Sequence, residues 1–550
     1  MPLHSHKIRQ GISLLLGLGW IIGTKAQSVD SSMDWTIRVV KFYRPPLQLG
    51  ERIPTPLPPD PPLNIQLDPT LEKAMPTRPP ARVGDSLPRI SLPRLARERL
   101  QPLPRFYAKA MIGNYAHFRI DFLTNSTYYP DKVYSIALRH QSGHYKLPHS
   151  SFSNQELVGN DERFLRNKKW LWYNQLRASR ASDGLYWEDS TAVDRTADSF
   201  PTYRQWRIRW QSKLTKVRYR MLPFSLMPAF QVITRGRLRE WSAQFEGMVY
   251  DTFAERHQVS IRTETEVYWI VGDSSAFQRM RYQITPAYAI NYLGGRLHVG
   301  FSAASTHEKV FYFFPDIMVE YPIQPGILTL RGGLDGSIQR FDYWHAFKEN
   351  PYLTEYPLLY FPVRTFHLYG QARWLPLPRL YGTLRVASEH VRNTPFYYAD
   401  STSAPAMNIQ YRTFRFFRVS ADLVVVHPLH WDLNGGWRFD YTRASIENDT
   451  VRAWHLPTFR MEAWARLSPH RKVVISPSAE WVGQRPVLTL EGKESSLPAY
   501  FLLHLTIQYR HSEMVAAHLR FDNLTNQLYH RWYGYPGTGF RIEGGLSIRF

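Results

Sequence analysis

Apolar and polar residues alternate with a period of two along most of the chain after residue 105. In one segment Trp206, Ile208 and Trp210 share one face, and Arg207 and Arg209 share the other. This period is typical of β-strands with one apolar and one polar face, and the longer segments reach about ten residues, enough to cross a membrane at a tilt. The pattern predicts an all-β structure.

A soluble β-sandwich or propeller would alternate in the same way, so other features decide between the classes. Aromatic residues are frequent near the ends of the segments, as in the girdles of membrane barrels. Residues 105–550 show no blade-length repeat and no separate helical pattern. At roughly 20 to 28 residues for each strand and its connection, they form about 16 to 22 strands. We therefore predict one large transmembrane antiparallel β-barrel over residues 105–550.

Longer breaks in the alternation predict connections between strands. Residues 141–163, 179–201 and 347–357 are candidates for outer loops or for segments that fill the lumen. A barrel of the expected size has a lumen wide enough for solutes unless a segment fills it.

Residues 1–26 have the features of an export signal. Lys7 and Arg9 precede an apolar run over residues 12–22, and Ala26 is a small residue at the expected cleavage site. The run is too short to span a bilayer. A signal peptide is the favoured interpretation, and a buried N-terminal helix is the alternative.

The next segment is rich in proline. Residues 44–104 carry 16 of the 40 prolines, and proline lacks the N–H donor that a sheet ladder needs. We predict that residues 27–104 form an extended periplasmic tether. A short β-prone run ahead of the prolines contains Thr36, Ile37, Val39 and Val40. This run is suited to adding a strand to the sheet of a protein partner, or to packing on the surface of the same molecule.

The final segment alternates up to the last residue. The apolar face of this predicted strand contains Phe540, Ile542, Leu546, Ile548 and Phe550. A terminal Phe on an alternating strand resembles the signal that bacterial outer-membrane barrels present to their insertion machinery. We therefore predict that these five residues form the barrel assembly signal.

Two further stretches resemble a known family. Residues 521–529, followed by Pro536 and Gly537, look like the closing hairpin of TonB-dependent receptors. Residues 103–115 and 134–143 are similar to plugless outer-membrane barrels that are usually labelled TonB-dependent-receptor-like. The similarity covers both ends of the predicted barrel and little of its middle.

The resemblance implies a location in the outer membrane, with the N-terminal segment in the periplasm. It also implies contacts with outer-membrane lipid and lipopolysaccharide, with the barrel insertion machinery, and with a candidate periplasmic protein partner. True TonB-dependent receptors carry a folded plug, whereas the material before residue 105 is the proline-rich segment. The sequence therefore predicts a barrel without a plug. Residues 34–40 could be likened to the short box that engages TonB, but such short patterns arise often by chance.

Composition and charge narrow the function. The absence of cysteine excludes disulfides, thiolate metal sites and cysteine nucleophiles. The net charge of +22 would favour a nucleic-acid partner if the basic residues formed one stripe, but they are spread singly, as at Arg207, Arg209 and Arg438. We therefore expect no nucleic-acid partner. These three arginines are candidates for lumenal selectivity toward anions. Basic residues at the rim could instead meet lipid phosphates, or the charge could belong to a solvated surface without a specific partner.

Catalytic motifs are not recognisable. The sequence has no phosphate-cradling loop, no zinc-binding His-Glu-x-x-His helix and no Gly-x-Ser-x-Gly elbow, and His140 with His144 is the closest candidate pair. We expect no enzyme activity, no cofactor and no metal site. Two functions remain open: a solute channel or transport-related pore, and a structural or assembly subunit that holds a periplasmic partner through the N-terminal arm.

Overall fold

The fold is seen in a computed structural model. It describes residues 105–126, 132–145, 150–165, 169–186, 202–216, 223–253, 256–272, 276–292, 294–308, 310–377, 379–399, 406–428, 432–447, 449 and 451–550. The predicted signal peptide, the predicted tether and the predicted partner strand at Thr36, Ile37, Val39 and Val40 lie outside these residues. They therefore stay predictions.

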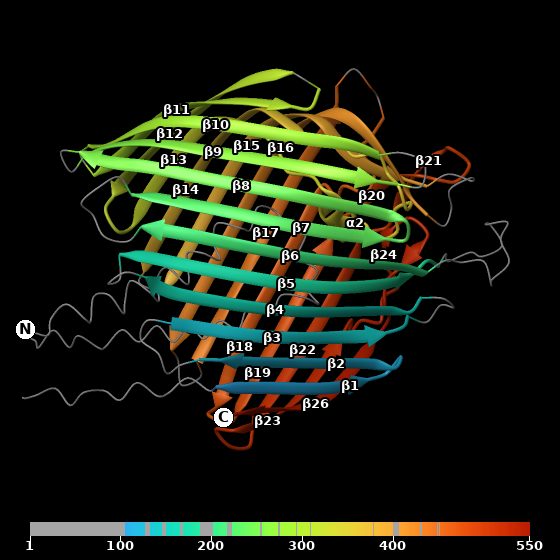
Figure 1. The fold of residues 1–550 in the computed structure, drawn as a ribbon. Helices are drawn as coiled ribbons and strands as arrows, with labels where there is room; N and C mark the ends of the chain where they lie inside the picture. The colour runs from blue at the N-terminus through green and yellow to red at the C-terminus, as the bar shows by residue number, and fades with distance from the viewer. Residues whose placement is uncertain are drawn as a thin grey trace, which may run out of the picture. The chain divides into compact units, whose positions relative to one another are not determined.

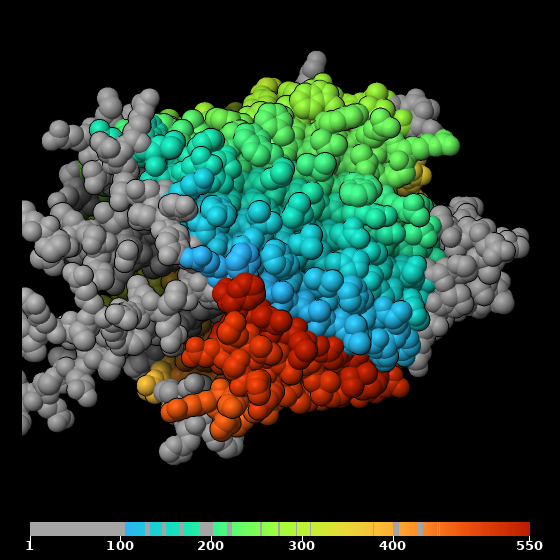
Figure 2. Space-filling model, turned by 60° about the horizontal axis from the view of Figure 1, so that its bottom comes forward, coloured from blue at the N-terminus to red at the C-terminus, as the bar shows by residue number. Residues whose placement is uncertain are grey.

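The described residues form a ring of 22 antiparallel strands (Figure 1). The ring strands are β1 (Phe106–Gly113), β2 (His117–Asn125), β3 (Lys132–Gly143), β4 (Phe152–Leu165), β5 (Trp170–Gly184), β6 (Thr202–Lys216), β7 (Phe224–Arg235), β8 (Leu238–Phe253), β9 (His257–Val271), β10 (Ala276–Tyr292), β11 (Gly295–Thr306), β12 (Phe311–Gln324), β13 (Leu328–Ile338), β14 (Val363–Leu377), β15 (Leu380–Tyr398), β16 (Asn408–Pro428), β17 (Asp432–Ile446), β18 (Phe459–His470), β19 (Val473–Val482), β22 (Tyr500–Arg510), β23 (Val515–Asp522) and β26 (Arg541–Arg549). Each strand pairs with the next one in the ring, and β26 closes the ring on β1, with Arg549 opposite Tyr107. Figure 2 shows the red C-terminal strands against the blue N-terminal strands at this seam. The predicted all-β barrel is confirmed, and its strand number lies at the top of the predicted range.

Connections at the two ends of the ring differ in length. At the end that holds Phe106 and Phe550, called here the terminus end, consecutive strands are joined by turns such as residues 325–327 and 471–472. At the opposite end, called the loop end, the connections include residues 339–362, 483–499 and 523–540. Two small hairpins lie within these longer connections, β20 (Arg485–Leu488) with β21 (Glu494–Leu497), and β24 (His530–Trp532) with β25 (Tyr535–Pro536). Short turns at one end and long loops at the other are typical of outer-membrane barrels, whose long loops face the outside.

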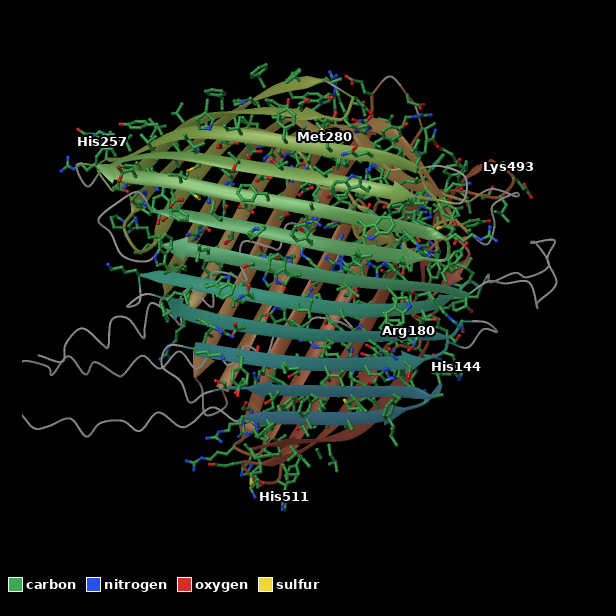
Figure 3. All side chains as sticks on the ribbon, viewed as in Figure 1. His144, Arg180, His257, Met280, Lys493 and His511 are labelled. Carbon is green, nitrogen blue, oxygen red and sulfur yellow. The ribbon has the colours of Figure 1, made fainter. Side chains whose placement is uncertain are left out.

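The outer face of the ring is apolar and its inner face is polar. On β6 the side chains of Trp206 and Ile208 are 50% and 53% exposed, whereas Arg207 between them is 5% exposed and faces the lumen. Met280 on β10 likewise lies on the outside, where Figure 3 labels it. No helix among the described residues is long and apolar enough to cross a lipid bilayer. The alternation read from the sequence therefore sorts side chains as predicted, with the apolar row toward lipid and the charged row toward the lumen.

Two of the predicted connections need correction. Residues 141–163 are mostly strand, because β3 continues to Gly143 and β4 begins at Phe152. Within residues 179–201, β5 continues to Gly184. Polar residues on both faces of β4 conceal its period of two, which made it look like a loop. The third prediction is confirmed, because residues 347–357 lie in a connection that packs against the inner wall.

That connection, residues 339–362, is called here the mouth loop. It links β13 to β14 and contains the helix α2 (Tyr343–Glu349). Its buried residues share one apolar cluster with inward side chains of the ring and with the β24–β25 hairpin. The cluster includes Phe341, Tyr343, Ala346, Phe347, Leu353, Leu359 and Phe361 of the loop, Ile233, Leu238, Tyr268, Ile270, Ala304, Phe314 and Tyr397 of the ring, and Trp532 and Tyr535 of the hairpin. Burying each large apolar side chain stabilises this packing by about 1.5 to 3 kcal/mol. The loop therefore occupies the inside of the ring at the loop end.

Candidate functional site

The candidate site is the mouth loop together with the wall that holds it. Asp342 begins α2 as its N-cap residue, because its side chain accepts a hydrogen bond from the backbone N–H of His345 at 2.9 Å. Such caps satisfy one of the free N–H groups that every helix start leaves. Lys348 lies in the last turn, where a positive charge is favourable. The loop therefore forms a local helix of its own at the mouth.

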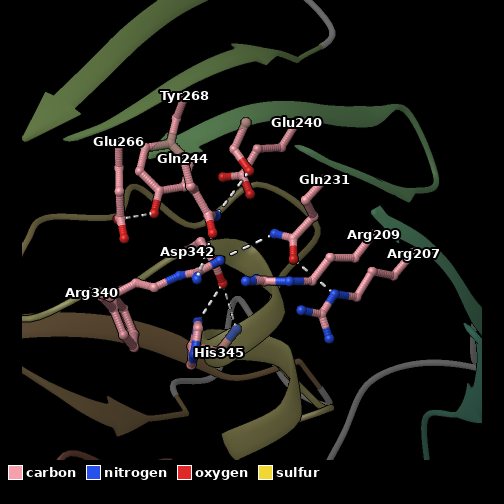
Figure 4. A network of polar contacts seen from close by, with 12 residues as sticks. Arg207, Arg209, Gln231, Glu240, Gln244, Glu266, Tyr268, Arg340, Asp342 and His345 are labelled. Carbon is pink, nitrogen blue, oxygen red and sulfur yellow. Dashed lines mark hydrogen bonds and ion pairs between the residues drawn. The ribbon is translucent and has the colours of Figure 1, made fainter. Parts of the chain in front are cut away.

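Asp342 is also the centre of a buried polar network (Figure 4). Its Oδ2 accepts hydrogen bonds from Arg340 Nη2 at 2.8 Å and from Gln231 Nε2 at 3.2 Å, and its Oδ1 lies 2.5 Å from His345 Nδ1. Burial alone would raise the pKa of Asp342, but the charges of His345 and Arg340 hold it well below its usual range. Asp342 therefore stays ionised and links the loop to the wall.

The network reaches three neighbouring strands. Gln231 on β7 accepts from Arg207 Nε on β6 at 2.8 Å, and Gln244 on β8 accepts from Arg340 Nη1 of the loop at 2.8 Å. These contacts form one chain from the wall, through Asp342, back to the wall. A buried network of this kind fixes a geometry only while all its members are satisfied.

Arginines of the wall also hold the backbone of the loop. Arg235 on β7 donates to the carbonyls of Pro351 and Leu353 at 2.9 and 2.8 Å. On β10, Arg279 donates to Leu359 O at 2.8 Å and to Phe341 O at 3.2 Å. Buried carbonyls need such donors, since an unpaired one costs about 1 to 3 kcal/mol. The wall therefore supplies the hydrogen bonds that a regular strand would have supplied.

Guanidinium groups stack on aromatic rings of the loop. Arg207 lies 4.1 Å from the ring centroid of Trp344, and Arg235 lies 3.9 Å from that of Phe347. Each desolvated contact of this type contributes about 2 kcal/mol. Together, the arginines of β6 and β7 therefore contact both side chains and backbone of the loop.

Carboxylates on the wall balance part of this positive charge. Arg281 pairs with Glu266 at 2.9 Å and with Glu264 at 3.1 Å. Glu240 is 0% exposed, and its oxygens have no hydrogen-bond partner among the described residues, with Arg279 Nη2 at 3.9 Å. An ionised carboxylate in this position is costly. Glu240 is thus the least satisfied group behind the loop.

A second buried charge cluster, called here the seam network, lies where the ring closes. Asp522 on β23 accepts from Arg541 on β26 and lies 3.0 Å from both Arg520 Nε and His504 Nδ1. Glu543 on β26 is also buried and lies 3.1 Å from His117 on β2 and from Arg541. These contacts join strand to strand and involve no residue of the mouth loop.

The structure separates the three arginines predicted to set selectivity. Arg207 and Arg209 both lie on β6 beside the mouth loop, and Arg209 donates to Gln211 at 3.3 Å. Arg438 lies on β17, on the opposite side of the 22-stranded ring, and pairs with Asp422 at 2.6 Å. Because a carboxylate neutralises it, Arg438 is less suited to attracting anions than the two arginines of β6.

The predicted assembly strand is β26. Its apolar row points outward, since Ile542, Leu546, Ile548 and Phe550 are exposed, and Phe540 precedes the strand and is partly buried. This arrangement provides the outward apolar row that the prediction needs. Its role in insertion stays a prediction.

Several residues of the site were missed in the sequence. They are Gln231, Arg235, Glu240, Arg279, Arg281, Arg340 and Asp342. One local signal existed, because an Asp followed by a short aromatic stretch at Asp342 can start a helix. For the wall arginines, the sequence indicates only that they lie in the polar row of a strand, and nothing in it predicts contacts with the mouth loop. The candidate pair His140 and His144 is not brought together, since His140 lies near Ser142 and His144 near the carbonyl of Tyr145. Among the described residues, no group of three or more side chains is arranged to hold a metal ion.

Comparisons with known proteins agree on the fold. No protein-family profile and no curated protein sequence matches the chain. Solved structures do match. The FrpB iron transporter from Neisseria meningitidis has a TM-score of 0.66 at 7% identity, over 82% of this chain and 82% of that one. The ferripyoverdine receptor of the outer membrane of Pseudomonas aeruginosa has a TM-score of 0.62 at 12% identity, over 82% and 72%.

The siderophore receptor PirA from Acinetobacter baumannii is similar to the same degree, with a TM-score of 0.63 at 10% identity over 81% of this chain and 80% of that chain. At these identities the likeness shows the fold alone. The described part of the chain is therefore a large barrel of the kind found in outer-membrane receptors. The receptor-like barrel expected from the sequence is confirmed at this level.

Proposed function

We propose that the chain is an outer-membrane pore that moves solutes, and that the mouth loop closes this pore at its outer end. The proposal includes a barrel without a folded plug, preceded by a periplasmic tether. The observation that carries it is the position of residues 339–362 inside the ring, held by side chains of β6, β7, β8 and β10. Similar barrels belong to an iron transporter and to siderophore receptors, which favours transport.

The charge behind the loop supports a pore over a passive anchor. Buried ion networks cost desolvation and seldom add stability over apolar packing. A barrel that only anchors a complex has no use for such a network at its mouth, whereas a loop that changes position needs polar contacts that water can replace. Arg207 and Arg209 on β6 form no ion pair with an acidic residue in the described part of the chain, which favours anionic solutes.

Single-channel conductance in planar bilayers tests the proposal. We expect the full-length protein to be mostly closed. A variant in which residues 343–357 are replaced by a Gly-Ser linker of equal length should give steady openings with a preference for anions. The matched control replaces residues 491–493, the exposed tip between β20 and β21, and should stay closed.

If neither the full-length protein nor the loop variant conducts, and each is shown to be folded by heat-modifiable gel mobility, the pore proposal is wrong. The assembly-subunit alternative rests on residues 27–104, outside the described residues. Deleting them tests it separately, because a subunit of that kind loses its periplasmic partner while a pore keeps its conductance.

A further inference from the structure

Three arginines at the loop end face away from the lumen. They are Arg180 on β5, Arg204 on β6 and Arg239 on β8, and Arg180 is labelled in Figure 3. Their orientation follows from the alternation, because the flanking residues Gln205, Leu238 and Glu240 are buried on the inside. Arg204 and Arg239 are exposed and Arg180 is partly exposed. We call these three residues the rim arginines.

The strand register places the rim arginines close together. Arg180 pairs with Trp206, Trp206 with Thr234, and Thr234 with Arg239, so that one row crosses four neighbouring strands. Neighbouring strands lie about 4.8 Å apart, so the two arginines of this row are about 14 Å apart at the backbone. Arg204 lies two residues before Trp206 on the same face. The guanidinium of Arg180 is 5.1 Å from the Trp206 ring centroid.

The next outward row toward the terminus end is apolar. Ile208, Trp241 and Trp269 in this row are 53%, 39% and 44% exposed, and Val232 pairs with Trp241, which pairs with Trp269. In a membrane barrel such a row faces the hydrocarbon or its interface. The rim arginines therefore lie at the depth where lipid headgroups begin.

The rim arginines have no carboxylate to neutralise them within the described part of the chain. No ion pair joins any of the three to an acidic residue there, and the buried Nε of Arg180 has no hydrogen-bond partner in the same residues. Another outward arginine at the loop end, Arg415 on β16, is different. It pairs with Glu447 at 2.6 Å, and Glu447 also lies 3.2 Å from His390.

We propose that the rim arginines bind the phosphate groups of an anionic lipid. Guanidinium is suited to phosphate because its N–H groups form two parallel hydrogen bonds to two oxygens. The charge has no acidic partner among the described residues. The ligand must also lie beside an exposed tryptophan row, which acyl chains can cover. A lipid meets both conditions in one molecule, whereas an acidic protein would leave the apolar row uncovered. The lipopolysaccharide expected as a partner belongs to this chemical class.

Native mass spectrometry of the full-length protein tests the site. The probes are phosphatidylglycerol or lipid A, which carry phosphate and net negative charge, and phosphatidylcholine, which carries phosphate without net charge. The protein should retain the anionic probes and release phosphatidylcholine. The triple variant R180Q/R204Q/R239Q should retain them at least about tenfold more weakly, because each basic residue near the surface adds its own attraction.

The variant R415Q is the matched control, since its guanidinium is already paired, and it should retain the anionic lipids like the unchanged protein. Equal retention by the triple variant and the unchanged protein would overturn the proposal. An equal loss in R415Q would also overturn it, because a general charge effect would then explain the binding. Inorganic phosphate that displaces the lipid at millimolar concentration would show a free-anion site instead.

If the triple variant does not fold, the salt dependence of lipid retention by the unchanged protein still tests the proposal. Phosphate contacts make binding fall steeply as salt rises, whereas contacts through acyl chains alone do not. Retention of lipid A that is unaffected by salt would therefore contradict the proposal. This site does not depend on whether the pore conducts.

Discussion

The mouth loop and the seam hold two buried charge clusters of similar composition and different consequence. At the seam, Asp522 and Arg541 face each other across β23 and β26, which the backbone ladder already joins. At the mouth, Asp342 joins residues 339–362 to strands that share no ladder with them. At the seam side chains reinforce a backbone ladder, whereas at the mouth side-chain contacts join the loop to β7, β8 and β10. The same chemistry therefore sets barrel stability in one place and the position of a loop in the other.

The largest effect is expected when the seam network is broken. Replacing Asp522 with Ala removes the carboxylate that Arg541 and Arg520 share and leaves Arg541 with Glu543 alone. Breaking a buried pair costs about 3 to 5 kcal/mol. We expect D522A to lower the temperature at which the barrel unfolds on heat-modifiability gels. It should not increase conductance, because the mouth loop is untouched.

The control for the seam is an exposed pair on the outer face. Glu447 pairs with Arg415, whose side chain is 66% exposed. The variant E447A should leave barrel unfolding nearly unchanged, because exposed ion pairs contribute little to stability. A similar loss of barrel stability in E447A and D522A would mean that burial does not distinguish the two pairs.

The mirror-image change at the mouth is D342A. It removes the acceptor shared by Arg340, Gln231 and His345, and with it the helix cap. A loss of about 3 kcal/mol from the closed position raises the open fraction roughly a hundredfold. We expect openings in planar bilayers together with a nearly unchanged unfolding temperature of the barrel.

This pair of variants decides the comparison. D342A and D522A should move different readouts, conductance in the first and barrel unfolding in the second. If D342A unfolds the barrel and leaves it closed, the mouth network is structural in the same sense as the seam. The pore proposal would then lose its closing element.

The alternation of apolar and polar residues predicts the strands of the seam better than it predicts the mouth loop. Strand β26 is recognisable in the sequence because Ile542, Leu546 and Ile548 all face lipid, and the membrane imposes this pattern on most of the ring strands. The inward direction of Arg207 and Arg209 followed from the same rule. Both predictions needed only neighbours in sequence.

The mouth loop could be predicted as a filler but its contacts could not. The bond between Gln231 and Asp342 joins residues 111 positions apart, and that between Arg235 and Leu353 joins residues 118 positions apart. No periodicity specifies such pairs, because either partner would be equally at home facing water. The prediction failed at strand β4 for a related reason. Polar residues lie on both its lumenal and its outward face, so the sequence shows no contrast between the two faces.

A smaller effect is expected from a glycine at the edge of the mouth. Gly236 forms the β7–β8 turn with φ of +56°, and Glu355 of the mouth loop lies against it, where a Cβ would clash. Oε1 of Glu355 accepts from the backbone N–H of Arg237 at 2.6 Å. The variant G236A should weaken the closed position by about 1 kcal/mol, which raises the open fraction about fivefold.

Gly326 provides the matched control for G236A. It has φ of +79° in the turn between β12 and β13 at the terminus end, and a Cβ there would meet no atom within 4 Å. The variant G326A carries the same type of backbone strain without touching the mouth loop. It should lower barrel stability slightly and leave conductance unchanged. Equal opening in both variants would show that strain alone, and not contact with Glu355, is responsible.

The smallest effect is expected from pH. Because the pKa of Asp342 lies well below its usual range, its contribution is fully present at neutral pH and is lost only as pH falls through that low value. Burial raises the pKa of Glu349, which accepts from Tyr397 at 2.8 Å, so protonation as pH falls relieves a cost and stabilises the loop. Both shifts predict a mouth that stays closed between pH about 7 and about 5. Conductance recorded across this range checks it, with E349Q expected to remove the slight gain on acidification. An increase in openings over the same range would mean that a group other than Asp342 holds the loop, and the contrast with the seam would then need a different residue at its centre.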